Sequence, residues 1–378
     1  MKIVIALDSF KGGMDAESAC KAVAHGIRRA DPRVECRLKP MADGGEGTAS
    51  AIMASRSDGE WISCRVTGPL PDRQADAGFA WLAEDGIAVV EMAAASGLPL
   101  LKENERDPMR TTTYGTGELL QAAAEHGARQ ILLTIGGSAT VDGGIGAAAA
   151  AGWQFLDKNG VALTPAGGSL TEIARIVGPK QNTLPPVTVL CDVTNPLTGE
   201  RGAAAVYGPQ KGATPAMVKT LAAGLRNLAE RIEVDLGCSG IAELPGAGAA
   251  GGLGAGAVAF FNAELSPGVS TVIKANGLKE ALSGADWCIT GEGSFDDQSL
   301  DGKVVSGVAE AAREQQVPVV VFAGRVKADM SKCRKHGIQQ AIATHAADMP
   351  MEEAIRRESE DLSDTATEWF NNLKGQTV

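Results

Sequence analysis

Three turns that combine glycine with acidic residues recur along this chain. They span residues 41–48, 136–146 and 290–299 and read MADGGEGT, GGSATVDGGIG and TGEGSFDDQS. Glycine lets a backbone approach a ligand closely, and the start of a helix offers N–H groups to an anion. A carboxylate repels a bound phosphate unless a cation lies between them, so the mixture indicates phosphate handled together with a divalent metal. A single such turn is often only a favourable turn sequence, but three in one chain favour a ligand site.

Acidic residues also follow apolar runs that read as strands. Asp8, Asp43 and Asp192 each stand at or just beyond such a run. In an open parallel sheet, ligands bind beyond the carboxyl ends of the strands, where paired carboxylates can bind a metal or accept a hydroxyl proton. Asp192 with Asn195 supplies two oxygen ligands of the kind used for magnesium, although the same residue types also begin ordinary turns.

Cations and hydroxyl groups complete the set of candidate residues. Ser9 and Lys11 follow the first expected strand, and their side chains suit a small carboxylate or a phosphate. Lys211 and Lys303 could bring positive charge to a phosphate, and the alternative for Lys303 is an ordinary surface lysine. The glycine-turn residues expected to contact a nucleotide are Gly44, Gly45, Gly137, Ser138, Gly291 and Gly293.

Some segments match common catalytic or nucleotide-binding motifs only in part. The loop Gly246–Gly251 fits the GxGxxG pattern, but no convincing strand comes directly before it. This argues against a nicotinamide site. A backbone cradle for phosphate or adenine that includes Gly248 is still open. Gly302-Lys303 has no glycine at position 297, so it is not a P-loop. The four histidines lie outside the glycine turns, which favours a carboxylate as the catalytic base.

Composition narrows the class of protein. The formal net charge of −11 argues against binding nucleic acid or an anionic membrane through bulk charge. The seven cysteines have no CxxC spacing, which favours free thiols in a reducing compartment. The apolar run at the start is too short for a signal peptide, and residues 244–263 are too rich in glycine and alanine to span a membrane, so we expect a cytoplasmic protein.

The elements that must position these residues alternate between strands and helices, which is typical of an α/β protein with mostly parallel strands. Strands are expected over Lys2–Leu7, Glu35–Leu38, Ala75–Leu82, Gly86–Glu91, Gln130–Ile135, Val187–Cys191, Val317–Phe322 and Gln339–Thr344. Helices are expected over Ala16–Arg29, Gly47–Ala54, Thr116–His126, Ala216–Ile232, Val304–Gln315 and Met351–Leu373. Residues 75–91 read as a hairpin, and the proline-rich stretch 66–74 as a crossing between domains.

Taken together, these segments resemble the bacterial glycerate kinases of the glycerate 2-kinase type. The resemblance spans nearly the whole chain and has a consistent order. It is carried by residues 8–12 (DSFKG), 40–48 (PMADGGEGT), 111–119 (TTTYGTGEL), 136–140 (GGSAT), 191–197 (CDVTNPL), 207–212 (YGPQKG), 290–293 (TGEG) and 298–299 (QS). Leu7, Val141 and Ser294 depart from the residues usual in that family.

The resemblance implies phosphorylation of D-glycerate with ATP and Mg²⁺, giving 2-phosphoglycerate. It implies a Rossmann-like parallel-sheet domain formed by residues 1–72 and 288–378, an inserted mixed α/β domain over 73–287, and an active site in the cleft between them. On this basis Asp192 or Asp43 would be the base, and Lys303 and Lys211 would counter phosphate charge. Asp8, Ser9 and Lys11 would bind substrate, and the metal ligands would be Asp296, Glu292 and Asn195. We expect a monomer or homodimer.

A kinase for a related small hydroxy acid stays open as an alternative, and so do two other classes of protein. A nicotinamide-dependent 2-hydroxyacid oxidoreductase would use the glycine loop at residues 246–251. A non-catalytic sugar-acid sensor would bind glycerate without consuming ATP.

Overall fold

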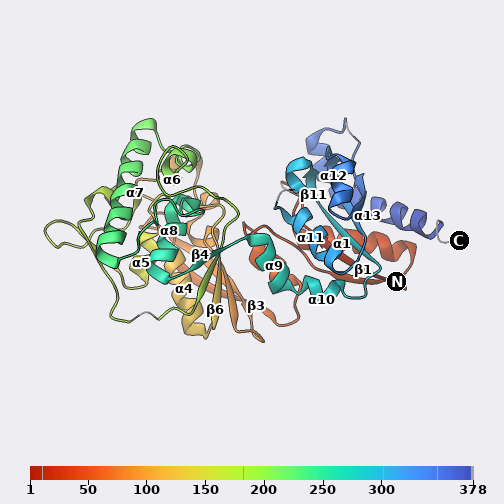
Figure 1. Cartoon of the computed structure of the whole chain (residues 1–378), viewed down its shortest axis with the longest axis horizontal. Coiled ribbons are helices and arrows are strands. Elements are labelled where there is room, and N and C mark those ends of the chain that lie inside the picture. The colour runs from red at the N-terminus through yellow and green to blue at the C-terminus, as the bar shows by residue number, and fades with distance from the viewer. Residues whose placement is uncertain (11, 182, 301, 347, 376–378) are drawn as a thin grey trace. The chain divides into compact units, whose positions relative to one another are not determined.

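The structure is a computed structural model that describes residues 1–10, 12–181, 183–300, 302–346 and 348–375 (Figure 1). The chain divides into two compact units. Unit 1 comprises Met1–Asp43, Ser50–Ser57 and Val269–Val378, and unit 2 comprises Gly44–Ala49 and Asp58–Gly268. The expected domain limits at 72/73 and 287/288 lie later in the chain than these, because residues 66–74 connect two paired strands of unit 2 and do not lead from one unit to the other.

Unit 1 is built on a parallel sheet whose strands come from both ends of the chain. The red N-terminal and blue C-terminal segments lie together in Figure 1. The strand order is β13-β12-β11-β1-β2, and all four pairings are parallel. The strands are β1 (Lys2–Leu7), β2 (Glu35–Leu38), β11 (Trp287–Phe295), β12 (Val319–Val326) and β13 (Ile338–Ala343).

Helices cover both faces of this sheet. The helices α1 (Ala16–Ala30) and α13 (Met351–Gly375) pack on one face, and α10 (Leu278–Leu282) and α11 (Val304–Glu314) contact the other. The remaining helices of unit 1 are α9 (Gly268–Asn276), α12 (Met330–Lys335), the short 3₁₀ helix η5 (Asp297–Leu300) and most of α2 (Thr48–Ala54).

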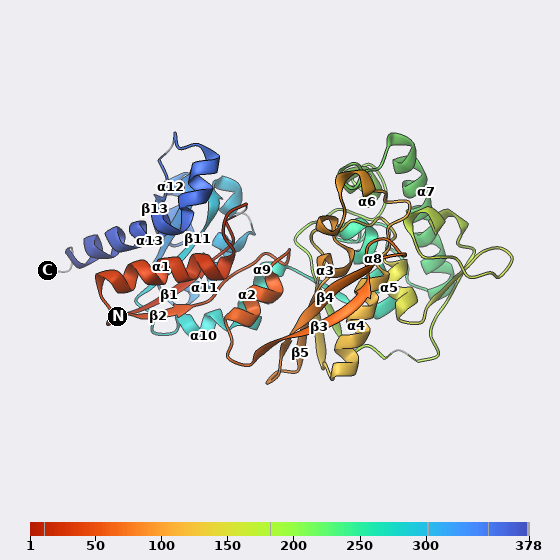
Figure 2. The ribbon, with the colours of Figure 1, turned by 180° about the vertical axis from the view of Figure 1, so that it is seen from behind.

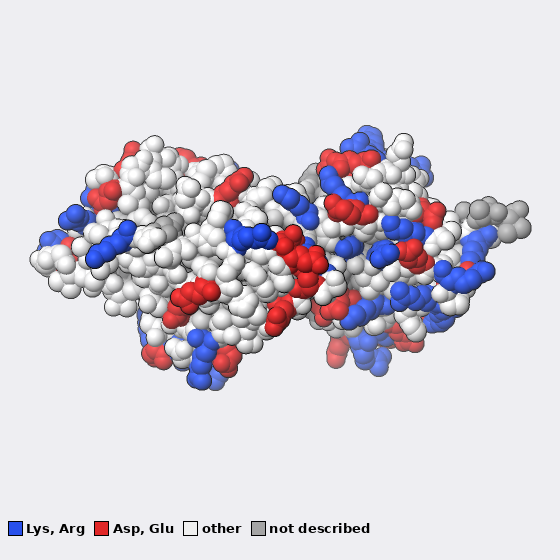
Figure 3. Space-filling view, turned by 90° about the horizontal axis from the view of Figure 1, so that it is seen from below, with Lys and Arg blue, Asp and Glu red and all other residues white. Residues whose placement is uncertain are grey.

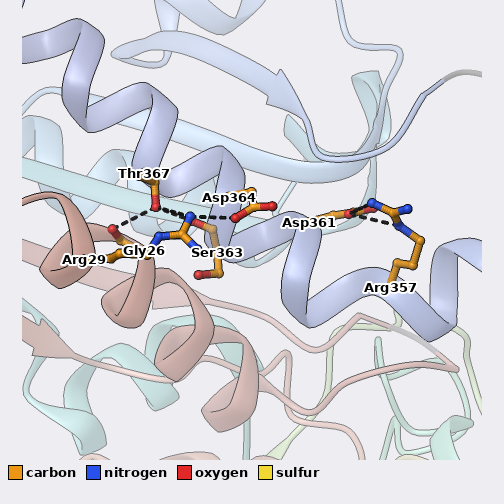
Figure 4. Close-up of polar contacts among 7 residues, drawn as sticks. All are labelled: Gly26, Arg29, Arg357, Asp361, Ser363, Asp364 and Thr367. Atoms are coloured by element: carbon orange, nitrogen blue, oxygen red, sulfur yellow. Dashed lines mark hydrogen bonds and ion pairs between the residues drawn. The ribbon is translucent and has the colours of Figure 1, made fainter.

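The contact between α1 and α13 combines an apolar core with polar links. A Cβ atom on Gly26 would lie 2.1 Å from the Ser363 carbonyl oxygen, so glycine is needed for the two helices to come this close. The Arg29 guanidinium donates to Asp364 and to the Thr367 hydroxyl at 2.6 and 2.7 Å (Figure 4). Apolar side chains from both helices and the sheet are buried beneath: Ile3, Ile5, Leu7, Val23, Ile27, Ile289, Val320, Phe322, Leu362, Trp369 and Phe370.

Unit 2 contains a six-stranded mixed sheet with the order β10-β9-β6-β5-β4-β3. The pairs β3/β4 and β4/β5 are antiparallel and the other three pairs are parallel, as the expected hairpin and mixed sheet require. Figure 2 shows β3, β4 and β5 side by side. The strands are β3 (Gly59–Thr67), β4 (Gln74–Leu82), β5 (Ile87–Glu91), β6 (Gln130–Thr134), β9 (Val187–Leu190) and β10 (Glu264–Ser266).

The helices of unit 2 bury a large aliphatic core against this sheet. They are α3 (Ala93–Ser96), α4 (Tyr114–His126), α5 (Ile145–Ala150), α6 (Ala203–Tyr207), α7 (Pro215–Leu236) and α8 (Ala249–Phe261). Short elements complete the unit: β7 (Gln154–Leu156), β8 (Arg175–Val177) and the 3₁₀ helices η1 (Leu98–Leu100), η2 (Glu103–Glu105), η3 (Gly167–Glu172) and η4 (Pro209–Lys211).

The expected α/β fold is confirmed, and two local expectations are wrong. Residues 290–295, which read as a turn, form the second half of β11, and β3 was not expected at all. Among the described residues, no helix is both long and apolar enough to cross a bilayer, and residues 249–261 form the largely buried helix α8. On the face drawn in Figure 3, basic and acidic side chains are interspersed.

Candidate active site

The first glycine turn lies across the carboxyl ends of the parallel strands of unit 2. Gly44 has φ +89°, and a Cβ atom there would lie 3.0 Å from Leu190 Cβ and 3.1 Å from Gly268 Cα. A Cβ atom on Gly136 would lie 2.9 Å from Gly45 Cα. The backbones of the first and second glycine turns are therefore in contact, beside the ends of β9, β10 and β6. Side chains at Gly44 or Gly136 would push these backbones apart.

Glu91 binds the backbone that follows the first glycine turn. It stands at the end of β5, and its Oε1 accepts a hydrogen bond from the Ala49 backbone N–H at 2.7 Å. Burial raises the pKa of Glu91, and hydrogen bonds from the backbone N–H groups of Ala49, Gly47 and Thr48 oppose that rise. Sequence reasoning missed Glu91, although an acid at a strand end is the signal that identified Asp8.

Asp192 stands just beyond the end of β9, with its carboxylate exposed. Its Oδ1 accepts a hydrogen bond from the Gly268 backbone N–H at 2.8 Å, which fixes the carboxylate next to the residue that packs on Gly44. Asn195, the expected metal ligand nearby, is held by protein groups at both ends of its amide. Its Nδ2 donates to the Arg201 carbonyl at 2.8 Å, and its Oδ1 accepts from the Tyr207 hydroxyl at 2.8 Å.

Lys211 is the most unusual charged group of unit 2, because only 1% of it is exposed. Its Nζ donates to Ser138 Oγ and to the Thr140 carbonyl oxygen, both at 2.6 Å. Burial lowers the pKa of Lys211 to about 7, and the negative charge of Asp142 partly opposes that shift. The ammonium group therefore acts on the second glycine turn through Ser138 and does not extend into solvent.

Asp142 holds the other half of the second turn. It is fully buried and accepts hydrogen bonds from the Thr113 backbone N–H at 2.7 Å, the Thr113 hydroxyl at 2.8 Å and the Gly144 N–H at 3.1 Å. Burial raises the pKa of Asp142, and these bonds oppose the rise. Asp142 thus ties the segment 111–113 to the turn, which explains why the motif TTTYG accompanies the motif GGSAT.

In unit 1, the carboxyl ends of β1 and β2 bring Asp8 and Asp43 to one edge, as expected. The Met41 N–H donates to the Leu7 carbonyl at 2.9 Å, so the chain after β2 continues beside β1 up to the two acids. Asp8 is fixed by its own backbone N–H, which donates to the Gly291 carbonyl at 2.9 Å.

Ser9 lies half-buried at this edge, and its N–H donates to Asp8 Oδ1 at 2.7 Å. Lys11 lies outside the described residues. At the nearby N-terminus of α1, Asp15 already accepts the Ser18 N–H at 2.7 Å. The anion-binding capacity of this N-terminus is therefore already used in part by the protein.

The third glycine motif serves strand packing. A Cβ atom on Gly291 would lie 1.8 Å from the Phe322 carbonyl oxygen, and one on Gly324 would lie 2.6 Å from the Gly293 carbonyl oxygen. Glu292 and Asp296 stand about 13 Å apart along extended chain and are not drawn together as in a turn. Lys303 is exposed at the residue before α11.

The glycine loop at residues 246–251, which overlaps the irregular start of α8, is also a packing device. A Cβ atom on Gly248 would lie 2.2 Å from the Pro196 carbonyl oxygen, and one on Gly251 would lie 1.9 Å from the Thr140 carbonyl oxygen. The described residues immediately before this loop, 237–245, form turns and no strand. The loop therefore lacks the strand that a dinucleotide fingerprint requires.

The predicted residues thus gather in two sets. Unit 2 brings together Gly44, Gly45, Gly137, Ser138 and Asp192, and unit 1 brings together Asp8, Ser9, Asp43, Gly291, Glu292 and Gly293. Within the described residues, no group of three or more His, Cys, Asp or Glu side chains forms a ready-made metal site. That the two sets share one cleft stays a prediction.

Comparisons with known proteins agree on one family. The sequence model of the Glycerate kinase family matches residues 3–374. The chain is 46% identical to a glycerate kinase of Halalkalibacterium halodurans, covering 94% of this chain and 93% of that protein. It is 41% identical to a glycerate 2-kinase of Escherichia coli, with the same coverage. A crystal structure of a putative glycerate kinase 2 from Salmonella typhimurium superposes with a TM-score of 0.89, at 39% identity over both whole chains.

Proposed function

Because the chain belongs to the glycerate kinase family and is therefore a kinase, we propose that it phosphorylates the 2-hydroxyl of D-glycerate with ATP. The observation that carries the proposal is the exposed, backbone-anchored Asp192 beside the Gly44 turn at the carboxyl edge of unit 2. A fixed carboxylate and a close-packed glycine turn are two parts that recur in sites of phosphoryl transfer, where the carboxylate accepts the hydroxyl proton and the turn approaches the phosphates. The 41% identity to a glycerate 2-kinase favours the 2-phosphoglycerate product.

The base in this reaction would be Asp192 or Asp43. As the glycerate hydroxyl oxygen forms its bond to the γ-phosphorus, the carboxylate accepts the hydroxyl proton, and the bond to the β–γ bridging oxygen breaks to release ADP. Asp192 suits this task because the Gly268 N–H orients one of its oxygens. Asp43 suits it because it directly precedes Gly44 in the chain.

The phosphates would be held by the glycine turns. Gly44, Gly45 and Gly137 have no side chains to keep a triphosphate away from the backbone. Lys211 can only donate when charged, so Ser138 Oγ accepts from it and the Ser138 hydroxyl hydrogen is left to donate to a phosphate oxygen. Lys303 would contribute a second positive charge. In such reactions positioning and charge neutralisation supply most of the rate acceleration.

The donor set fits Mg²⁺. The predicted ligands Asp296 and Glu292 offer carboxylate oxygens and Asn195 an amide oxygen, the ligand types that Mg²⁺ prefers, and the Asn195 oxygen already accepts a hydrogen bond from the Tyr207 hydroxyl. Mg²⁺ also commonly takes only one or two carboxylates and completes its shell with phosphate oxygens and water, which agrees with the dispersed acids of the described chain. When bound, the ion would neutralise charge on the triphosphate.

A coupled assay tests the proposal. ADP release would be followed with D-glycerate, L-glycerate, glycolate and lactate, and the product would be offered to enolase, which uses 2-phosphoglycerate directly. We expect ADP release with D-glycerate and immediate use of the product. ADP release without use by enolase would contradict the 2-hydroxyl assignment, and no ADP release with any hydroxy acid would contradict the proposed function.

A further inference from the structure

A hollow of about 710 Å³ lies on one face of the sheet of unit 2, within the size range of small-molecule sites. Its floor is formed by β3 and β4, and its walls by α3, by Pro99 and Leu100 of η1, and by Glu46 of the first glycine turn. Glu91 marks the end nearest that turn. The hollow is therefore continuous with the turn that we propose for the phosphates.

The alternation of β3 explains why this face is open. Ile62, Cys64 and Val66 pack toward the core of unit 2, whereas Trp61, Ser63 and Arg65 are exposed on the other face. The alternation is the pattern of a half-buried strand, and the sequence analysis did not make use of it. On the exposed face of β3, the large aromatic side chain of Trp61 therefore lies beside the polar side chains of Ser63 and Arg65.

Trp61 is held in place without being covered. A Cβ atom on Gly78 would lie 2.8 Å from both Cε2 and Nε1 of the indole, so the ring rests directly on the Gly78 backbone of the neighbouring strand. At the same time 41% of Trp61 is exposed. An aromatic ring supported on one side by backbone and open on the other is a preorganised surface for stacking a flat ligand.

Polar groups beside the indole are available to a ligand. Arg65 and Asp76 face each other directly across the β3/β4 pair, yet in the described part of the chain neither makes an ion pair. A guanidinium and a carboxylate in this position can read the donors and acceptors on the edge of a heterocycle. Glu46 and Glu91 place further carboxylates on the side of the glycine turn, where ribose hydroxyls would donate.

We propose that this hollow binds the nucleoside of the phosphate donor, with its base stacked on Trp61. The choice of ligand rests on the proposed kinase function, because a donor held by its phosphates at residues 44–45 must place its nucleoside beside that turn. The hollow has the volume, the aromatic surface and the polar edge groups for this ligand, and it shares Glu46 with the turn.

Fluorescence tests the site without requiring activity. Adenosine and AMP would be titrated into the wild type, Trp61→Phe and Trp81→Phe. Trp81 is the matched control, since it lies on β4 but packs against His126 on the opposite face, with ring centroids 4.9 Å apart. We expect saturable quenching in the wild type and Trp81→Phe, and its loss in Trp61→Phe.

Kinetics test the same site in the working enzyme. Trp61→Ala is expected to raise the KM for ATP about tenfold, the scale of a lost base–aromatic stack, and to leave the KM for glycerate unchanged. Ser63→Trp fills the hollow from an exposed strand position and is expected to have the same effect. It covers the case in which Trp61→Ala does not fold.

The outcomes separate the two proposals. A wild type whose Trp61 is quenched by adenosine but which phosphorylates no hydroxy acid would overturn the proposed function and support this site. An active enzyme whose KM for ATP is unchanged in both variants, or whose KM for glycerate alone rises, would overturn this site and leave the function intact. Equal quenching in Trp61→Phe and the wild type would also overturn it.

Discussion

The carboxyl edges of the two sheets are built in different ways. In unit 2, glycine turns pack backbone against backbone, and the charged groups beneath them, Asp142 and Lys211, are buried. In unit 1, the acids at the edge are partly exposed, and the helices behind it are linked by exposed ion pairs such as Arg29 with Asp364 (Figure 4). One edge is therefore fixed by buried polar bonds, whereas the other offers charge to solvent.

This difference indicates that the two edges have different roles. A surface of fixed backbone groups can position phosphates without reorganising, and partly exposed acids can exchange protons and bind ions. It also predicts different sensitivity to substitution. Small changes in unit 2 should disturb packing, whereas exposed polar changes in unit 1 should be tolerated unless they alter the chemistry.

The largest expected effect tests which edge supplies the base. Asp192→Asn keeps an oxygen for the Gly268 N–H but cannot accept a proton, so kcat should fall by about 10²–10⁴ if Asp192 is the base. Asp43→Asn is the matched variant in unit 1. Steady-state kinetics and thermal unfolding of both would be measured, and unfolding should change little. Near-normal kcat in both variants would refute the assignment of either residue.

The second prediction concerns the close-packed glycines. Gly251→Ala would place a Cβ atom 1.9 Å from the Thr140 carbonyl oxygen, at φ +68°, and should lower the free energy of unfolding by about 3 kcal/mol. Gly199→Ala is the control, because its φ is +90° but no atom lies within 4 Å of the added Cβ. It should cost about 1 kcal/mol in urea unfolding. Equal losses of unfolding free energy in the two variants would mean that glycine is needed at position 251 for its backbone conformation and not for close packing.

The third prediction concerns the buried charge of unit 2. The pKa of Lys211 is lowered to about 7 in the folded protein, against an ordinary value of 10.5. Between these pH values the unfolded chain binds more protons, so this group makes the folded state more stable as pH rises from about 7 toward 10. Lys211→Met should remove that contribution in urea unfolding at pH 7, 8 and 9. Parallel stability curves for the two proteins would show that the ammonium is not destabilised by burial.

The smallest expected effect lies in unit 1. Arg29→Ala removes an ion pair whose side chains are about half exposed, and should cost less than about 1 kcal/mol. Leu362→Ala removes a fully buried side chain from the same helix pair and should cost about 3 kcal/mol. Chemical unfolding monitored by far-UV circular dichroism would measure both losses. A larger loss for Arg29→Ala than for Leu362→Ala would show that the exposed ion pair, and not apolar burial, stabilises this helix pair.

The regular elements were predictable where one periodic pattern dominated. The strands Lys2–Leu7 and Glu35–Leu38 have the predicted limits, and α1 extends one residue beyond its predicted end. By contrast, Gly291 resembles a turn residue, and only the neighbouring strand β12 shows why glycine is needed there. Local sequence cannot report a contact with residues that are distant along the chain.

The candidate site was predictable in its residue types but not in its contacts. The acids at strand ends were identified by position, and Glu91 follows the same rule although it was missed. The burial of Lys211 could not be foreseen, since a lysine after a turn is usually exposed and its partners Ser138 and Thr140 lie about 70 residues away.

The pairing of α1 with α13 has a consequence for synthesis on the ribosome. Thr367 donates a hydrogen bond to the Gly26 carbonyl across 341 positions of sequence, so the first helix emerges long before its neighbour exists. Because residues are synthesised in order, we expect unit 2 to fold before α13 is available. The N-terminal segment would stay unfolded and open to proteases during that time. Nascent chains stalled at residue 350 should then yield a protease-resistant unit 2 and a digested N-terminus, and protection of both would contradict this order.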